Sequence, residues 1–168
     1  MNYLIAIDVG FRNLGMCVYS FEDNRVIYWR NCALMSGRYQ PKDTVRYVVE
    51  FVAHHKQFFD GARTVLIERQ MRPAMRIIEA AFETLFYGRA VVLCPRSVKN
   101  HWKLCSKNYS ENKRKAVAWA SDFVEENIDT FDSEPYLCWK SAKKRDDMAD
   151  ALLTLMFYLD TYSNQLGS

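Results

Sequence analysis

The chain has 168 residues, of which 49% are hydrophobic, and it carries a formal net charge of +3 at pH 7. Length and composition exclude a disordered polypeptide and predict a single domain over residues 1–168 with a substantial core. The sequence has no apolar run of membrane-spanning length and no basic segment ahead of an apolar signal core, so we expect no membrane partner and a cytoplasmic location.

The first predicted element is a strand over residues 3–8, an apolar run that ends in the carboxylate of Asp8. A glycine-containing turn and a second apolar run follow, which predicts a hairpin. Burying an unpaired carboxylate is costly, so Asp8 indicates a metal ion or another cationic partner. The alternative is a turn aspartate that accepts a hydrogen bond from its own backbone.

Turn and cap signals divide the rest of the chain into further strands and helices. A proline at the start and a glycine just past the end mark a helix, and short apolar runs between helices mark strands. We predict further strands over residues 15–20, 25–34, 64–68 and 90–94. We predict helices over residues 43–59, 73–87, 112–127 and 144–162, with a short turn at 97–104 and a loop around Pro135.

This order of elements predicts an α/β fold with a mixed five-stranded sheet flanked by helices. Short hairpins make the first three strands antiparallel, and right-handed helical crossovers make the fourth and fifth strands parallel to the first. The carboxyl ends of the first and fourth strands then lie side by side, which brings Asp8 next to Glu68. Two like charges so close repel each other unless a cation lies between them.

The start of the last predicted helix carries three more acids. Asp147 and Asp150 are three residues apart and share one helix face, whereas Asp146 points about 100° away from Asp147. Helix capping and the helix dipole could explain Asp146 and Asp147 without any ligand. Asp150 lies too far into an apolar stretch for capping, so we expect it to face the sheet.

Asp8, Glu68, Asp147 and Asp150 together would make an all-oxygen site that suits Mg²⁺ or Mn²⁺ better than zinc. Such sites can hold two cations roughly 4 Å apart, which contact the attacking and leaving oxygens of a phosphodiester. The acids therefore predict metal-assisted hydrolysis by an activated water molecule, with no covalent protein nucleophile.

A basic segment between residues 96 and 115 predicts a nucleic-acid substrate. His101, Trp102 and Tyr109 are interleaved with its seven basic residues, which are Arg96, Lys99, Lys103, Lys107, Lys113, Arg114 and Lys115. Basic residues can neutralise phosphates, and aromatic residues offer stacking surfaces. The alternative is a solvated basic helix face. The five cysteines include no CxxC pair, which favours reduced thiols over a disulfide framework or a zinc site.

These motifs resemble the RuvC-type Holliday junction resolvases of the ribonuclease H-like superfamily, and the resemblance covers nearly the whole chain. It rests on a strand ending in Asp8-x-Gly, a strand ending in Glu68 before a helix, and Asp147-x-x-Asp150-Ala-Leu on the last helix. The compact length and the segment Lys143-Lys-Arg-Asp-Asp-Met-Ala-Asp look most like the poxvirus members. The resemblance implies a ribonuclease H-like fold and a Mg²⁺-dependent endodeoxyribonuclease.

The resemblance also implies the substrate and the assembly. A homodimer would cut two opposed strands of four-way junction DNA, leaving 5′-phosphate ends, and would resolve viral concatemers in the host-cell cytoplasm. Its dimer surface could involve the helix over residues 73–87, whose apolar side chains exceed one narrow core stripe. These side chains are Met75, Ile78, Phe82 and Phe86, and their packing inside the domain is the alternative.

Roles for single residues follow from the same resemblance. Asp8 would bridge two Mg²⁺ ions, with Glu68 and Asp150 holding one each. Asp147 would complete the second site, and Asp146 is a possible alternative ligand. Lys113 would act as a catalytic residue beside the acids, and Lys99 with Lys113 looks like the family's paired DNA-contacting lysines. The expected DNA-binding residues are Phe11, Arg12, Met71, Arg72, Lys99, Lys113 and Lys115. Met71 stands where the bacterial enzymes carry an aromatic residue.

Three other functions remain open at this point. The segment Ile7-Asp8-Val-Gly also resembles the phosphate loop of actin-like ATPases and sugar kinases. Those proteins need a second domain with a second such loop, which the sequence does not offer, so we expect no nucleotide cofactor. A non-catalytic junction-binding or RNA-binding module would need the basic segment but not all of the acids. A metal-dependent nuclease acting on RNA or flap substrates is closer in class.

Overall fold

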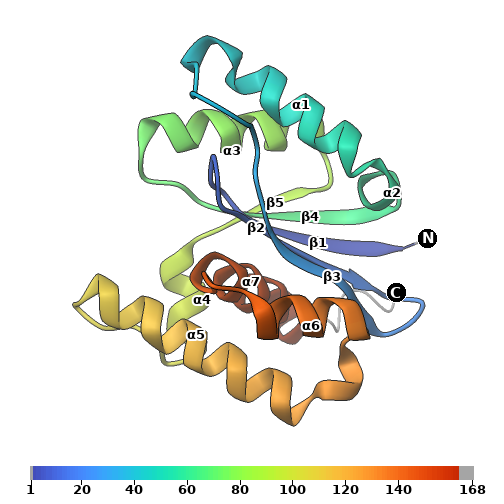
Figure 1. Cartoon of the computed structure of the whole chain (residues 1–168), viewed down its shortest axis with the longest axis vertical. Coiled ribbons are helices and arrows are strands. Elements are labelled where there is room, and N and C mark those ends of the chain that lie inside the picture. Colours follow the sequence, from blue (N-terminus) through green and yellow to red (C-terminus); the bar gives the residue numbers. More distant parts are fainter. Residues whose placement is uncertain (1, 163–168) are drawn as a thin grey trace.

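The computed structural model describes residues 2–162, which form a five-stranded sheet with helices on both faces (Figure 1). The strands lie in the order β3-β2-β1-β4-β5 and are β1 (Tyr3–Asp8), β2 (Leu14–Ser20), β3 (Arg25–Cys32), β4 (Ala62–Glu68) and β5 (Ala90–Leu93). The pairs β1–β2 and β2–β3 are antiparallel, and β1–β4 and β4–β5 are parallel. The predicted α/β fold with a mixed sheet is confirmed.

The register of the central strands brings two acids to one edge of the sheet. Asp8 is opposite Gly15 of β2, and the preceding Ile7 is opposite Ile67 of β4. Asp8 and Glu68 therefore occupy equivalent positions at the carboxyl ends of adjacent parallel strands. Helices cover both faces of these strands, which explains why the residues that precede each acid are continuously apolar.

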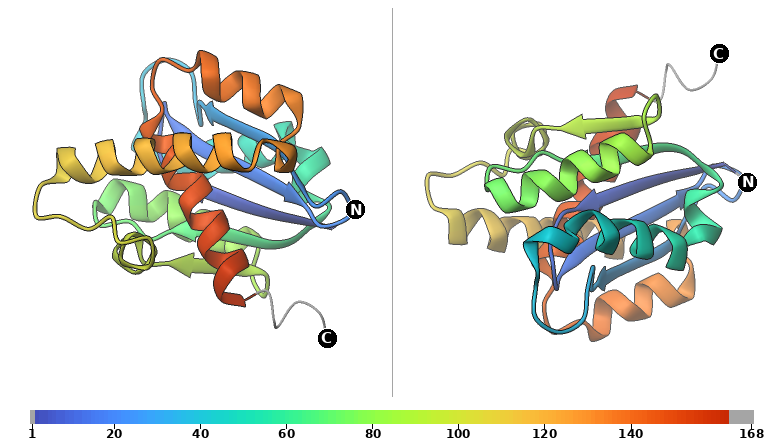
Figure 2. Two further views of the ribbon diagram at one scale, coloured as in Figure 1. Left: turned by 90° about the horizontal axis from the view of Figure 1, so that it is seen from below. Right: turned by 90° about the horizontal axis from the view of Figure 1, so that it is seen from above.

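One face of the sheet is covered by α1 (Thr44–His54), α2 (Lys56–Phe59) and α3 (Pro73–Leu85), as the right view of Figure 2 shows. A 3₁₀ turn (Pro41–Asp43) precedes α1, and the single helix predicted over residues 43–59 is interrupted at His55. The His55 backbone has φ −104° and ψ 25°, and its ring nitrogen Nδ1 lies 2.9 Å from the Phe51 carbonyl oxygen.

The four apolar side chains proposed for a dimer surface lie in or against the core of the domain. Ile78, Phe82 and Phe86 are buried in the core between α3 and the sheet, and Met75 packs against its edge. Of the two alternatives, core packing is therefore correct for Ile78, Phe82 and Phe86, while Met75 is only partly buried.

The other face is covered by α4 (Pro95–His101), α5 (Tyr109–Glu126), α6 (Ser133–Ser141) and α7 (Asp146–Tyr162), seen in the left view of Figure 2. A short 3₁₀ turn (Ile128–Thr130) links α5 to α6. α7 lies directly on β1 and β2, and most of its first ten residues are buried. Within residues 2–162, no helix is long and apolar enough to span a membrane.

Two local predictions on this face need correction. The loop predicted around Pro135 is the helix α6, which begins at Ser133. Proline is tolerated in the first turn of a helix because no intrahelical acceptor is available there for its missing N–H. The helix predicted from residue 112 begins at Tyr109, because the Asn108 side chain accepts hydrogen bonds from the backbone N–H groups of Ser110 and Glu111.

Candidate active site

Four acids from three elements line one open cavity of about 1080 Å³ at the carboxyl edge of β1 and β4. Asp8 comes from β1, Glu68 from β4, and Asp147 and Asp150 from the first turns of α7. Asp146 does not line this cavity. The structure thus brings together the four acids predicted from the sequence.

Three of these acids are held where ionisation is unfavourable. Burial raises the pKa of Asp8 well above its ordinary value, and the neighbouring charges of Glu68 and Asp150 raise it further. Burial also raises the pKa of Glu68 to about 8, with a further contribution from Asp150. The pKa of Asp150 is raised by burial against the opposing effect of Lys99. Ionising these three carboxyl groups together is therefore unfavourable unless a further positive charge lies among them.

Lys99 of α4 is a largely buried cation that pairs with Asp150. Its side chain is only 15% exposed, and Nζ lies 3.1 Å from Oδ1 of Asp150. Burial opposes the charge on Lys99, but Asp150 and Glu68 outweigh this effect and raise its pKa. The same Oδ1 atom is buried without a hydrogen-bond partner, so the contact has the distance of an ion pair but not the alignment of a hydrogen bond.

The residues present fit a hard divalent cation. Carboxylate oxygens are the preferred protein ligands of Mg²⁺, which keeps several water molecules and needs only one or two carboxylates beside its substrate. Oδ1 of Asp150 offers an acceptor without a hydrogen-bond donor. Among residues 2–162, no three acid, histidine or cysteine side chains are arranged so that they could hold a metal ion as they stand. An incoming ion would therefore have to draw the acids together.

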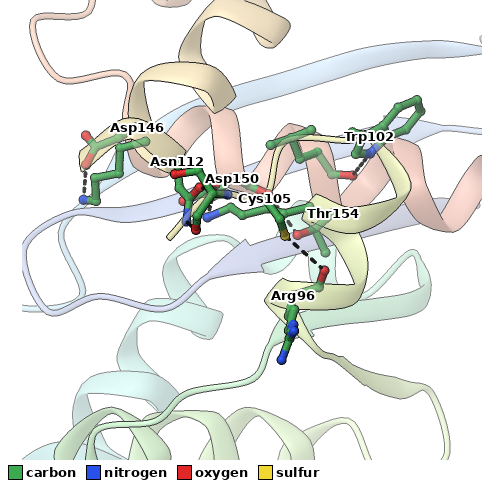
Figure 3. Close-up of polar contacts among 11 residues, drawn as sticks. Arg96, Trp102, Cys105, Asn112, Asp146, Asp150 and Thr154 are labelled. Atoms are coloured by element: carbon green, nitrogen blue, oxygen red, sulfur yellow. Dashed lines mark hydrogen bonds and ion pairs between the residues drawn. The ribbon is translucent and has the colours of Figure 1, made fainter. Parts of the chain in front are cut away.

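Asp146 lies outside the cavity and has two lysine partners. Its carboxylate forms an ion pair with Lys113 of α5 (Figure 3), and Lys144 Nζ lies 3.6 Å from its other oxygen. Although burial acts to raise it, the pKa of Asp146 is lowered by its hydrogen bond from Lys113. Lys144 also pairs with Asp147. The structure thus places Asp147 at the cavity and Asp146 in a lysine pair beside it.

Six of the seven residues predicted to bind DNA line the same cavity. These are Phe11, Arg12, Met71, Arg72, Lys99 and Lys113. Met71 is 85% exposed, and Phe11 packs against Tyr39 with ring centroids 4.0 Å apart. Lys115 is the exception, since it does not line the cavity and its Nζ lies 3.0 Å from Glu111 on the same helix.

The cavity also contains basic residues outside the predicted set of DNA-binding residues, although two of them, Arg96 and Lys107, belong to the predicted basic segment. Arg69, Arg96, Lys107 and Lys144 line it as well. Arg69 follows Glu68 directly, and Lys144 precedes the acids of α7, so proximity to the acid motifs is the sequence signal that could have found these two residues. The floor of the cavity is acidic, and much of its wall is basic.

The position of α7 depends on β2 and β3 as well as on its own sequence. A Cβ atom on Gly15 would lie 2.0 Å from the carbonyl oxygen of Asp147, so only glycine allows this approach. Trp29 Nε1 donates a hydrogen bond to the Met148 carbonyl oxygen (2.8 Å), and Asn31 Nδ2 donates one to that of Lys144 (2.6 Å). Three residues outside the cavity thus hold the helix that carries two of its acids.

Comparisons with known proteins identify one matching protein family and several solved structures with a similar fold. The family described as Poxvirus A22 protein matches residues 2–161, whereas no curated protein sequence matches the chain. The fold is similar to that of the fowlpox virus Holliday junction resolvase, with a TM-score of 0.67 at 16% identity over 95% of this chain and 98% of that chain.

Two further solved structures share the fold. The yeast mitochondrial Holliday junction resolvase Ydc2 has a TM-score of 0.67 at 22% identity, over 96% of this chain and 83% of that chain. RuvC of T. thermophilus, in complex with a Holliday junction substrate, has a TM-score of 0.55 at 15% identity, over 98% and 96% of the two chains. At these identities the likeness establishes the fold.

Proposed function

The chain belongs to the Poxvirus A22 protein family, and we propose that it is a divalent-metal-dependent endonuclease that resolves four-way DNA junctions. The observation that carries this proposal is the meeting of Asp8, Glu68, Asp147 and Asp150 in a cavity whose wall is basic. The fowlpox virus resolvase and T. thermophilus RuvC, which share the fold, have both been solved with Holliday junction DNA.

The four acids would hold the metal. Asp8 interacts electrostatically with Glu68 and with both α7 acids, Asp147 and Asp150, which suits it to bridge two ions. Glu68 and Asp150 would bind one ion each, and Asp147 would complete the second site. Two Mg²⁺ ions, or Mn²⁺ in their place, would activate the attacking water and neutralise charge on the scissile phosphate.

The lysines have two different roles in this proposal. Lys99 is buried against Asp150, so its charge acts within the acid cluster and stabilises negative charge at the reacting phosphate. Lys113 lies at the cavity and pairs with Asp146, which keeps its ammonium group beside the acids until a phosphate competes for it. Arg12 and Arg72 lie on the cavity wall and would contact the DNA backbone.

Junction resolution also requires two cuts in opposed strands. A homodimer with a two-fold axis supplies two symmetry-related active sites for this purpose. Hydrolysis that leaves 5′-phosphate and 3′-hydroxyl ends would give nicks that a ligase can seal. For a poxvirus family member, the substrate would be branched DNA in viral genome replication, within the host-cell cytoplasm.

The test is a comparison of labelled four-way junction, linear duplex and flap DNA, each incubated with the pure protein with and without Mg²⁺. We expect the junction alone to be converted into two nicked linear duplexes, only with Mg²⁺, with ends that ligase seals. Faster cleavage of flaps or RNA would favour a nuclease of another specificity. Tight junction binding without cleavage in Mg²⁺ or Mn²⁺ would favour a binding module.

A further inference from the structure

Glu79 is a buried acid of α3 that lies outside the set of four cavity acids. It is 5% exposed, and its neighbours Ile78 and Phe82 on the same helix are fully buried. A carboxylate in such surroundings is unfavourable unless it accepts hydrogen bonds. Oε2 of Glu79 accepts one from the backbone N–H of Gln70, at 2.6 Å. The partner of this buried acid is therefore the loop that follows Glu68.

That loop, residues 69–72, connects β4 to α3 and lies along the cavity, which all four of its residues line. Its first residue extends the β4–β5 pairing, because the N–H of Arg69 donates to the Leu93 carbonyl oxygen at 2.9 Å. Its last residue, Arg72, is fixed by the start of α3, since its carbonyl oxygen accepts from the N–H groups of Met75 and Arg76.

Gln70 is held on two sides. In addition to the backbone contact with Glu79, its side-chain Nε2 donates to the Glu68 carbonyl oxygen at 3.0 Å. Gln70, which lies between Arg69 and Met71, is thus tied both to α3 and to the backbone of Glu68. Met71 itself is 85% exposed, so its side chain adds almost no buried area to the fold.

We propose that Glu79 is a positioning residue that clamps Gln70, and thereby sets the direction in which Glu68 and Met71 face the bound DNA. A hydrogen bond to a charged acceptor is strong, and it restricts a short loop that would otherwise sample many conformations. Since the loop places an exposed apolar side chain at the cavity, its order contributes to substrate recognition rather than to the core. The proposal rests on the proposed nuclease function for its effect on cleavage.

The test compares three variants of the full chain. Glu79→Leu keeps the volume but removes the acceptor, Glu79→Gln keeps an acceptor oxygen, and Glu83→Leu changes an exposed acid one turn further along α3. Hydrogen exchange is measured at the Gln70 amide and at core amides of β1 and β4. Junction cleavage in Mg²⁺ and the thermal shift caused by Mn²⁺ without DNA are measured in parallel.

In Glu79→Leu we expect the Gln70 amide to exchange about tenfold faster or more, and kcat/KM on the junction to fall by about tenfold. Core amides should keep their relative protection, and Glu79→Gln should restore both readouts to within about threefold of the wild type. Glu83→Leu should match the wild type. Equal effects of Glu79→Leu and Glu83→Leu, or unchanged Gln70 exchange in Glu79→Leu, would overturn the proposal.

The wild-type protein supplies a test that depends on no variant. Its Gln70 amide should exchange at least about tenfold more slowly than the same residue in an unstructured peptide. A Gln70 amide without this protection overturns the clamp even if Glu79→Leu fails to fold. Failure of the nuclease proposal would appear differently, as absence of cleavage in every protein, including the wild type, with the exchange results unaffected.

Discussion

Gly15 of β2 and Asp147 of α7 are in direct contact, so close that a Cβ atom on Gly15 would lie 2.0 Å from the Asp147 carbonyl oxygen. Gly15 is also the residue opposite Asp8 in the β1–β2 pair. The absence of one side chain therefore sets the separation between an acid at the end of β1 and the acids at the start of α7. The cavity depends on this separation.

Gly15→Ala should displace the start of α7 and weaken metal binding. Since a misplacement of about 1 Å can reduce catalysis about a hundredfold, we expect a loss of cleavage of that order. The thermal shift caused by Mg²⁺ or Mn²⁺, measured without DNA, should shrink as well. Gly88→Ala is the matched control: its φ of +84° makes alanine unfavourable, but no atom lies within 4 Å of the added group. A wild-type metal response in Gly15→Ala would contradict this account.

Removing the charge of a cavity acid should lower cleavage more than removing the charge of Asp146. Asp8→Asn, Glu68→Gln and Asp150→Asn should each lower cleavage by more than the about 10–100-fold cost of changing a residue outside the metal ligands. Junction binding should be largely retained, because the basic wall is unchanged. Asp147→Asn should lower cleavage more than Asp146→Asn, since Asp147 lines the cavity and Asp146 does not. The reverse order, or an active Asp8→Asn protein, would contradict the proposed metal site.

The placement of Asp8 and Glu68 could be predicted from the sequence because it depends on local signals and on general rules of strand connection. Each apolar run identifies a strand, and a helical crossover makes the two strands parallel, so both acids must lie at one edge. The choice of Asp147 over Asp146 follows from helix periodicity. The loop predicted around Pro135 is wrong, because a proline in the first turn of a helix and a proline in a loop look alike in the sequence.

Contacts between distant elements could not be predicted in the same way. The pairing of Lys99 with Asp150 requires α4 to pack beside α7, and the contact of Glu79 with Gln70 requires the loop after β4 to fold back along α3. In the sequence, Glu79 stands in an apolar helix and has the spacing of an ordinary surface acid. The role of Gly15 depends on the backbone of a helix more than 130 residues further along the chain.

Removing the charge of Glu68 should stabilise the metal-free protein at alkaline pH. The pKa of Glu68 is raised to about 8 in the folded state, from an ordinary value of 4.5. Between these two pKa values the unfolded chain loses its proton first, so stability falls as the pH rises from about 4.5 to about 8 and then levels off. Glu68→Gln lacks this loss, and we expect its Tm in EDTA at pH 9 to exceed that of the wild type by on the order of 5 °C.

The same comparison at pH 4 supplies the control, because the wild-type carboxyl is then protonated in both states and the difference should largely disappear. Adding Mg²⁺ at pH 8 should raise the Tm of the wild type more than that of Glu68→Gln. If Glu68→Gln is less stable than the wild type in EDTA at pH 9, the folded state does not disfavour the ionised form of Glu68.

Lys113 and Lys99 should affect DNA binding differently. Lys113→Ala should weaken junction binding and reduce the slope of log K against log salt by about one unit, as expected for one phosphate contact. Lys99→Met should instead reduce cleavage with an unchanged slope, because its ammonium group is buried against Asp150. Lys115→Ala is the matched control, since Lys115 lies outside the cavity. If the slope falls for Lys99→Met and stays unchanged for Lys113→Ala, the two lysines have the opposite roles.

Paired cuts in opposed strands require a dimer in this proposal. Only substitutions at exposed side chains of α3 can test this requirement, because substitutions at its buried side chains would disturb the fold. Phe82 is fully buried, so Phe82→Glu should unfold the chain through an unpaired buried charge. Ile77 is also on α3 but is 46% exposed, and Val45 and Val49 of α1 on the same side of the sheet are 56% and 45% exposed. We expect a two-fold contact to cover these exposed apolar side chains of α1 and α3.

Analytical ultracentrifugation at micromolar concentration should give the wild type twice the 19.7 kDa mass of one chain. Ile77→Glu should give a folded monomer that still nicks junctions but no longer cuts both strands in one binding event, because each active site then acts alone. Leu137→Glu places the same charge at a 62% exposed residue of α6, on the opposite side of the sheet, and should remain a dimer. A dimeric Ile77→Glu protein with a monomeric Leu137→Glu protein would move the contact to α6. A wild-type monomer that converts junctions into paired linear duplexes would refute the requirement for a dimer.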